Sequence, residues 1–466
     1  MAQVQNDFNV VQAPAGIFYP QDFSLQKLNL ITSTGKPFEL KKIIVEMSYY
    51  EDIYSFAVSG SVTVRDAQGF IELLQLSGNE FLEVNFGKIK NAPNNDDQIF
   101  RVYKIGRRSP SGNMNNEYYT LYFCSEELFL SEQIKVTKSF GRSKISDIVS
   151  NILTETLQVD PTKINVIENT TGVYNFIVPR LKPLETISWL STYARPENGV
   201  GSDMLFFENR DGFNFRSLQS IYSDNVYATY NYQQKNLNIN DATDPQQKAT
   251  TVIDYEFIKT YDALGDTSSG TYANRLITID PLTRYYKVTD FDYSEYQSEA
   301  TSLNGQPVIT PSANRLGITQ NQAYDAVTKL LISNANQAQN QYIQNAPGSV
   351  AGDIFAETYI PNRTAQIALA NYTLLKIMVP GDPGLSAGRV INFNLYSLKP
   401  TDKQKDADKF YSGKYLVVAV RHIIDDAGSY ITVMEIAKES SPKTYSPVDS
   451  SSPNIMNAIT QYWKIF

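Results

Sequence analysis

The chain has 466 residues, more than the roughly 100 to 200 of an ordinary domain, so we expect about two to four packed units. Hydrophobic residues make up 42% and charged residues 19%, which excludes disorder of the whole chain. A formal net charge of -8 gives no overall support to a surface that clamps nucleic acid. One His and one Cys nearly exclude zinc chemistry and exclude a disulfide within the chain.

Signals for export or membrane insertion are sparse. The first residues lack a basic region followed by an apolar run, and no stretch of about 18 apolar residues occurs. We therefore expect a soluble protein that is not exported and has no membrane anchor. The 31 Tyr and 23 Phe residues suit half-buried strands and wet interfaces, because a Tyr ring packs while its hydroxyl stays hydrated.

Residues 25–125 alternate between apolar and polar side chains. This period of two predicts half-buried antiparallel strands, and we expect a small β-barrel. Its inward residues are predicted to include Val58, Gly60, Val62, Val64, Leu82, Val84, Phe86, Tyr119, Leu121 and Phe123. Residues 66–78 place Phe70, Leu73 and Leu74 at helical spacing, which predicts a short helix that plugs or caps the barrel.

Residues 126–225 read as a mixed α+β unit. The apolar spacing from Ile145 to Leu153 predicts an amphipathic helix with Ser143 as its cap, and a second helix is expected to begin at Pro183. Residues 164–178 read as two strands, and residues 206–215 as a hairpin around Asp211 and Gly212.

From residue 226 the pattern returns to strands. Residues 319–343 are predicted to form a long helix, with Ala323, Val327, Leu330 and Leu331 on one face, and a short helix is expected near Ile367. Four further strands are expected between 374 and 437. Gly78 precedes one apolar strand and Gly388 another in a similar layout, which favours a duplicated barrel.

Catalytic chemistry finds little support. His422 lies in an expected strand, on the face of Leu416, Val418 and Val420, and we interpret it as a packed or edge histidine. The GxSxG spelling around Ser386 lies between turn residues and a strand, whereas a serine elbow follows a strand and precedes a helix. Cys124 follows an aromatic strand and is expected to be buried and inert.

Other site chemistry is equally weak. The pairs Asp290 and Asp292, Glu126 and Glu127, and Asp425 and Asp426 have no distinguishing context for glycoside cleavage. Phosphate-binding glycine loops and calcium loops do not occur in the sequence. The most basic local cluster, Lys88, Lys90, Arg107 and Arg108, is explained by solvated strand ends. We therefore predict no catalytic, cofactor or metal residues, and the profile favours an assembly role.

Several segments resemble baseplate hub proteins of contractile-tailed bacteriophages, which are related to tail tubes and to the spike hubs of type VI secretion. The resemblance rests on the "YEDI", "SGSVTVRDA" and "LSGNEFLEVNF" layouts within residues 43–87. It extends to residues 183–194, 270–287 and 411–440, together about half of the chain. It implies a structural virion protein of the tail baseplate, a late protein made in the host bacterial cytoplasm.

The resemblance also implies an architecture: a mainly β chain with two tail-tube-like antiparallel barrels and inserted α/β domains. Three chains would form a ring of six barrels that joins the six-fold tail tube to the central spike. The implied division is an N-terminal arm and first barrel (1–125), an α+β domain (126–225), a second barrel (226–258 and 370–440), an inserted cup (259–369) and a tail (441–466). Tail tube, spike, tape-measure and baseplate wedge proteins are the implied partners, with DNA only in transit.

Two other functions stay open. A tail-associated cell-wall hydrolase would need a carboxylate pair in a cleft and would show activity in peptidoglycan zymography. A receptor-binding or fibre adaptor would carry fibrous repeats, which this sequence lacks. In the tail, Ile455, Ile459, Tyr462, Trp463 and Phe466 form an apolar stripe, and we expect Tyr462, Trp463 and Phe466 to dock on a partner or, alternatively, on their own domain.

Overall fold

The fold is built mainly from strands. A computed structural model describes residues 23–33, 35–88, 97–110, 116–232, 249–280, 285–307, 327–332, 356–396, 407–426 and 428–443. Within them, antiparallel sheets dominate and helices occur as short insertions, which confirms the predicted mainly β class. No helix in these ranges is long and apolar enough to cross a membrane.

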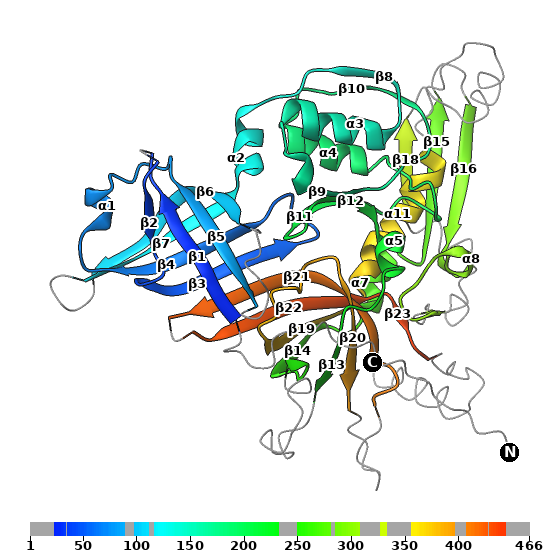
Figure 1. Ribbon diagram of the computed structural model, residues 1–466. Helices are drawn as coiled ribbons and strands as arrows, with labels where there is room; N and C mark the ends of the chain where they lie inside the picture. The colour runs from blue at the N-terminus through cyan, green and yellow to red at the C-terminus, as the bar shows by residue number, and fades with distance from the viewer. Residues whose placement is uncertain are drawn as a thin grey trace, which may run out of the picture.

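The first strand set surrounds one apolar core at the left of Figure 1. Its elements are β1 (Phe23–Ile31), β2 (Pro37–Glu39), β3 (Ile44–Asp52), β4 (Ser59–Asp66), α1 (Phe70–Leu73), β5 (Phe81–Lys88), β6 (Gln98–Pro110) and β7 (Glu117–Ser125). The ten residues predicted to face inward are all buried, so the alternation identified the correct face. The predicted short helix is α1, and its buried Phe70 packs on Phe38 with ring centroids 4.3 Å apart.

The second strand set encloses a separate core. It consists of β13 (Thr229–Tyr232), β14 (Asp254–Lys259), β19 (Thr373–Pro380), β20 (Val390–Leu395), β21 (Gly413–Asp425) and β22 (Tyr430–Lys438). Its neighbour order is β13-β20-β21-β22-β19-β14, and that of the first set is β1-β5-β6-β7-β4-β3. When the strands of each set are taken in chain order, the two sets have the same neighbour order: β1, β3, β4, β5, β6 and β7 correspond to β13, β14, β19, β20, β21 and β22. One pairing differs in direction, because β1 pairs with β5 antiparallel and β13 with β20 parallel.

The duplication that Gly78 and Gly388 indicate in the sequence is therefore also present in the strand order of the two sets. Gly78 precedes β5 and Gly388 precedes β20, and both have a positive φ, 94° and 87°. Such a backbone conformation is readily adopted by glycine because it has no Cβ.

The two sets are joined through β3 and β21, which pair from Asp52↔Ala419 to Glu46↔Asp425. As a result, thirteen described strands belong to one continuous sheet, with β21 between β3 and β22 (Figure 1). Closure of either set into a barrel is not detected among the described strands.

Residues 126–225 form a compact helical and β region above the two strand sets (Figure 1). Its elements are α2 (Glu126–Gln133), β8 (Ser139–Ser143), α3 (Ile145–Asn151), a π-helix (Ile152–Thr156), a 3₁₀ turn (Pro161–Lys163), β9 (Ile164–Ile167), β10 (Tyr174–Ile177), α4 (Pro183–Ser191), β11 (Met204–Asn209), β12 (Gly212–Ser217) and α5 (Leu218–Tyr222). Strand β9 pairs with β12, and β10 pairs with β8, so the two predicted strands lie in different sheets.

The predicted helices and hairpin of this region are present, but the proposed cap is wrong. Lys144, not Ser143, precedes α3, and Ser143 ends β8, where its hydroxyl donates to the carbonyl of Gly141. The strand pairing of β8 with β10 thus decides where the helix begins. Helix α4 begins at Pro183 as predicted.

The region between β14 and β19 adds a smaller sheet. It contains α7 (Ala263–Ser268), β15 (Ala273–Asp280), β16 (Tyr285–Asp292), α8 (Tyr293–Glu299), β17 (Gln306–Pro307), β18 (Thr328–Ile332) and α11 (Ala356–Ala370). Strand β15 lies between β16 and β18, and β17 pairs with β23 (Ser440–Ser441). Helix α11 contains Ile367 and is a 15-residue helix rather than the short one expected.

The predicted long helix at 319–343 is wrong where the structure describes it. Residues Thr328–Ile332 form β18, which pairs parallel with β15 along five residues. A short run such as KLLI fits both the helical period of 3.6 residues and the strand period of two residues. Pairing with a neighbouring strand decides between them. Residues 319–326 and 333–343 lie outside the described residues.

We predict that Gly60→Ala lowers stability by about 1–3 kcal/mol, the usual cost of overpacking a filled core. A methyl group at Gly60 in β4 would lie 2.1 Å from Cζ of Phe123 and 2.6 Å from the carbonyl oxygen of Ser48. The matched control is Gly87→Ala in β5, where a methyl group meets no atom within 4 Å. Urea unfolding of both variants checks this, and equal midpoints would contradict it.

Candidate functional site

The single histidine is a structural residue in β21. His422 is fully buried, and its Nδ1 lies 2.8 Å from the hydroxyl of Tyr430. Burial, with a smaller contribution from nearby Arg210, lowers the pKa of His422 to about 3, so the ring stays neutral at ordinary pH. This supports the interpretation of His422 as a packed histidine.

The predicted face of His422 is only partly correct. A bulge between Val417 and Ala419 shifts the register of β21. Leu416 and Val418 therefore pack in one core, while Val420 contributes to another. A strand bulge changes which side chains share a face, and alternation alone does not reveal it.

The other nucleophile candidates lack a catalytic setting. Ser386 is buried in the connection from β19 to β20, where its hydroxyl accepts a hydrogen bond from Nε of Arg389 at 2.9 Å. A strand follows it, so the strand–serine–helix order of an elbow is absent here. Cys124 is buried, and burial raises the pKa of its thiol to about 11, which opposes thiolate formation.

In two of the candidate acidic pairs, one carboxylate forms an ion pair. Asp290 accepts from Nε of Arg275 at 2.6 Å, and Glu127 accepts from Nζ of Lys163 at 2.7 Å. Within the described ranges, no group of three or more His, Cys, Asp or Glu side chains is placed to hold a metal ion.

Sequence patterns did not single out Arg210 for any role, yet it links three parts of the chain. It lies at the tip of the β11–β12 hairpin, and its guanidinium donates to the carbonyl oxygens of Pro383, at 3.0 Å, and Phe86. The same guanidinium lies 4.3 Å from the ring centroid of Phe86. The backbone N–H of Arg210 donates to Glu51 at 2.9 Å. We call these contacts the hairpin joint.

The hairpin joint continues through Glu51. Its carboxylate also accepts from the backbone N–H of Ala387 at 2.7 Å, so one buried acid contacts both the hairpin and the β19–β20 connection. Burial raises the pKa of Glu51 to about 7, while the two N–H donors and Arg210 oppose the rise. These contacts fix the α+β region against both strand sets.

A groove of about 900 Å³ lies beside the hairpin joint. Its walls come from β6, the 3₁₀ turn and the β11–β12 hairpin, and they carry acids such as Asp97 and Asp160 together with Lys163 and Arg389. The lining thus mixes acidic and basic side chains, and its carboxylates include Glu127 and Glu208.

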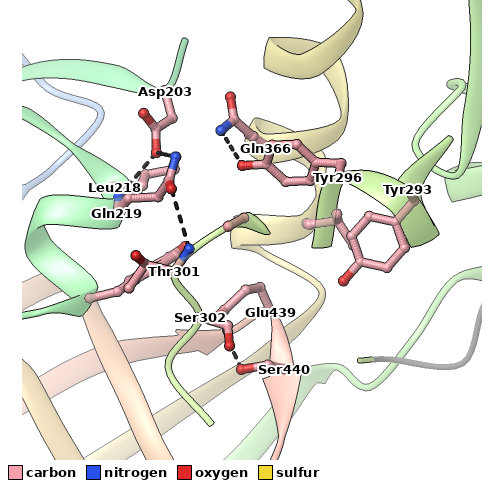
Figure 2. A pocket seen from close by; sticks show the side chains of 13 residues that line it. Asp203, Leu218, Gln219, Tyr293, Tyr296, Thr301, Ser302, Gln366, Glu439 and Ser440 are labelled. Carbon is pink, nitrogen blue, oxygen red and sulfur yellow. Dashed lines mark hydrogen bonds between the residues drawn. The ribbon is translucent and has the colours of Figure 1, made fainter. Parts of the chain in front are cut away.

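A second hollow, of about 40 Å³, lies between α5, α8, α11 and the end of β22 (Figure 2). Figure 2 shows Gln219 bridging Asp203 and the backbone of Thr301, while Gln366 contacts Tyr296. The backbone N–H of Leu303 donates to Glu439 at 2.6 Å. Its small volume and internal hydrogen bonds make it a polar connection between elements rather than a substrate site.

The predicted docking residues Tyr462, Trp463 and Phe466 lie outside the described residues. Arg107 and Arg108, interpreted from sequence as solvated strand ends, are exposed at the end of β6, and Arg108 pairs with Glu117 in β7.

Comparisons with known proteins agree with the resemblance found in the sequence. No family model matches the chain. It is 22% identical over 405 residues to the probable baseplate hub protein gp334 of Vibrio phage KVP40, covering 85% of this chain and 90% of that protein. The chain resembles phage baseplate hub proteins.

Two solved tail proteins have a similar fold. The 43 kDa tail protein of prophage MuSo2 from Shewanella oneidensis has a TM-score of 0.50 at 7% identity, covering 89% of this chain and 98% of that one. The tail protein of Neisseria meningitidis MC58 has a TM-score of 0.50 at 10% identity, covering 90% and 99%. At these identities the likeness concerns the fold.

Buried Glu208 lines the groove and provides a test of how burial changes the pKa of a carboxyl group there. Its carboxylate accepts from the backbone N–H of Val58 at 2.9 Å and from the hydroxyl of Ser125. Burial, with a smaller contribution from Glu127, raises the pKa of Glu208 to about 8, whereas the pKa of a glutamate in the unfolded chain is about 4.3.

We predict that Glu208→Gln reduces the loss of stability between pH 6.5 and 8. In that range the folded protein keeps a proton that the unfolded chain has lost, so stability falls by up to about 1.4 kcal/mol per pH unit. The variant should lose about 1–2 kcal/mol less than the wild type over this range in urea titrations. Exposed Glu72→Gln is the control, and identical slopes for all three proteins would contradict the prediction.

Proposed function

We propose that this chain is a structural subunit of the baseplate hub of a contractile phage tail. The observation that carries the proposal is the match over 405 residues to a probable baseplate hub protein, which spans nearly all of both chains. The shared fold with two tail proteins supports it. The protein would act in the virion, at the tail baseplate, after synthesis in the host cytoplasm.

The proposed role is non-enzymatic. His422 is buried and neutral, Ser386 lies outside an elbow, and Cys124 has a raised thiol pKa, so the residues that sequence analysis weighed do not form a nucleophilic centre. A cell-wall hydrolase remains the alternative, and a carboxylate pair acting in the groove beside the hairpin joint would be its basis. A fibre adaptor has no specific observation in its favour.

In the proposed assembly, three copies form a ring between the tail tube and the central spike. The matching strand order of the two sets supports two tube-like units per chain, so three chains would supply six. The first unit would lie within residues 1–125, and the second would combine 226–258 with 370–440. Residues 126–225 and 259–369 would form the wider part of the hub. Tape-measure and wedge proteins are further proposed neighbours, and DNA would pass through the ring.

The assembly proposal predicts the copy number of the chain in purified tails. Mass spectrometry with microscopy should find three copies per tail, located between tube and spike. Six copies, or a location in fibres, would contradict the proposed ring. Peptidoglycan hydrolysis that a single acid substitution abolishes would instead favour the hydrolase.

A second proposal concerns the tail. Removal of residues 444–466 deletes Tyr462, Trp463 and Phe466 but keeps β23, whose Ser441 pairs with Gln306. If these aromatic residues dock on a partner, the truncated chain should keep its melting temperature and lose incorporation into tails. A lower melting temperature would instead indicate packing on the chain's own domain. The full-length triple variant Tyr462→Ser, Trp463→Ser, Phe466→Ser separates side-chain docking from chain length.

A further inference from the structure

Strand β21 divides one of its edges between two partners. Residues Gly413–Leu416 pair with β20, and residues Ala419–Asp425 pair with β3. The opposite edge pairs with β22, with a bulge between Val417 and Ala419. Across the shared edge, Arg421 donates to Glu46 at 3.1 Å and to Ser48 at 3.0 Å. This contact between the strand sets lies within one chain.

Strand β6 is the counterpart of β21 in the first set, with one edge segment left open. Both strands have 13 residues, and β6 pairs with β5 at 98–101 and with β7 along its opposite edge. Its bulge, between Val102 and Lys104, occupies the same place. Where β21 binds β3, residues 104–110 of β6 have no paired strand among the described residues.

Strand β14 is the counterpart of β3. It pairs with β19 as β3 pairs with β4, and its other edge has no strand partner in the part of the chain that the structure describes. The exposure of the side chains differs between the covered edge of β3 and the open edge of β14. Met47 and Tyr49 of β3 are 0% exposed, while the corresponding Tyr255 and Phe257 of β14 are only partly buried. Ile253 and Ile258, beside them, are 47% and 48% exposed.

The two open edges carry opposite charge. Asp254 and Glu256 are exposed on β14, and Lys104, Arg107 and Arg108 are exposed on β6. Open strand edges of this kind invite pairing, and complementary charges favour one partner over another.

We propose that β14 of one copy pairs antiparallel with residues 104–110 of β6 in a second copy, in the manner of the β3–β21 contact. The occupant of each open edge is thus a second copy of this chain, and the contact is head-to-tail, which gives a ring when the rotation between copies closes. The proposal rests on the proposed hub function and identifies the surfaces through which the copies associate.

Equivalence of the sets also gives the register. Ser109 of β6 pairs with Tyr118 of β7, and Ile423 of β21 pairs with Ile431 of β22 at the same place in the repeat. Ser109 therefore corresponds to Ile423. Glu256 pairs with Lys376, as Ser48 pairs with Ser61, so Glu256 takes the place of Ser48. Since Ile423 is opposite Ser48, Ser109 is placed opposite Glu256 of the neighbouring copy.

A bulge between Gly106 and Ser109 modifies this register locally. Arg107 there has a φ of 51°, and in the proposed pairing the extra residue would lie opposite Phe257 of the neighbouring copy. In the proposed pairing, the bulge would bring Arg107 and Arg108 beside Glu256 of the neighbouring copy, and Arg108 also pairs with Glu117 of its own chain.

Strand β2 is a competing edge, because it is the outermost strand at the other end of the sheet and is followed by exposed Lys41 and Lys42. The second set contains no counterpart of β2 in its described strands, so the repeat does not predict a partner for it. The experiment compares the two edges directly.

Disulfide trapping tests the register. In the full-length variant Ser109→Cys, Glu256→Cys, opposed residues of paired strands place their Cα atoms about 4.5–5.5 Å apart, within disulfide range. Cys124 is buried, with its thiol pKa raised to about 11, and should not interfere. Oxidation should give covalent dimers and trimers, while each single variant gives dimers at most. Crosslinking of Lys42→Cys, Glu256→Cys in its place would overturn the proposal.

Charge reversal tests the electrostatics. Arg107→Glu, Arg108→Glu and Asp254→Lys, Glu256→Lys should each raise the concentration needed for association by about ten-fold or more, and the quadruple variant should recover it. Lys41→Glu, Lys42→Glu is the matched control, with the same change in charge, and should associate like the wild type. Light scattering measures association. No recovery in the quadruple variant, with circular dichroism unchanged, would overturn the pairing.

The two proposals fail in different ways. Tails that contain three copies but give no 109–256 crosslink would refute this interface and leave the hub function intact. Tails that lack the chain would refute the hub function, whether or not the purified chain forms the crosslink.

Discussion

The division of one β21 edge between β20 and β3 is the constraint on which the arrangement of the strand sets depends. A 13-residue strand is long enough to complete one set with its first residues and to join the other with its last. The bulge after Val417 lets it turn between them, because an extra residue increases local twist and changes the side-chain face. His422, Ile424 and Tyr430 then pack near the first set although they belong to the second in sequence.

The hairpin joint stabilises the same junction between the two strand sets through contacts from the α+β region. Arg210 donates to carbonyl oxygens of Phe86 and Pro383, one from each strand set, and Glu51 accepts from backbone groups on both sides. A buried carboxylate without such donors would be costly, so hairpin and strand sets depend on one another. This explains why an inserted α+β region can take a fixed position over the sheet.

Sequence patterns predicted the parts of the fold that local periodicity determines. The inward residues of β4, β5 and β7 followed from alternation, and α4 followed from Pro183 and its apolar spacing. Pairing decided the rest: β18 became a strand because β15 lies beside it, and the bulge in β21 moved His422 to another face. Arg107 and Arg108 were noticed only as basic residues, since their position on an open edge is defined by strand order.

The β3–β21 contact and the proposed β14–β6 contact differ in how the two strands would find each other. Strands β3 and β21 belong to one chain, so their effective concentration is high, and the Arg421–Glu46 ion pair across this edge is not needed to select the partner strand. A contact between separate chains has no such tether and must reject wrong pairings, such as β14 with another β14. Acidic residues on β14 and basic residues on β6 oppose each like-with-like pairing and favour the head-to-tail one. In the proposed assembly, the charges on β14 and β6 would therefore supply the selectivity that covalent linkage supplies to β3 and β21.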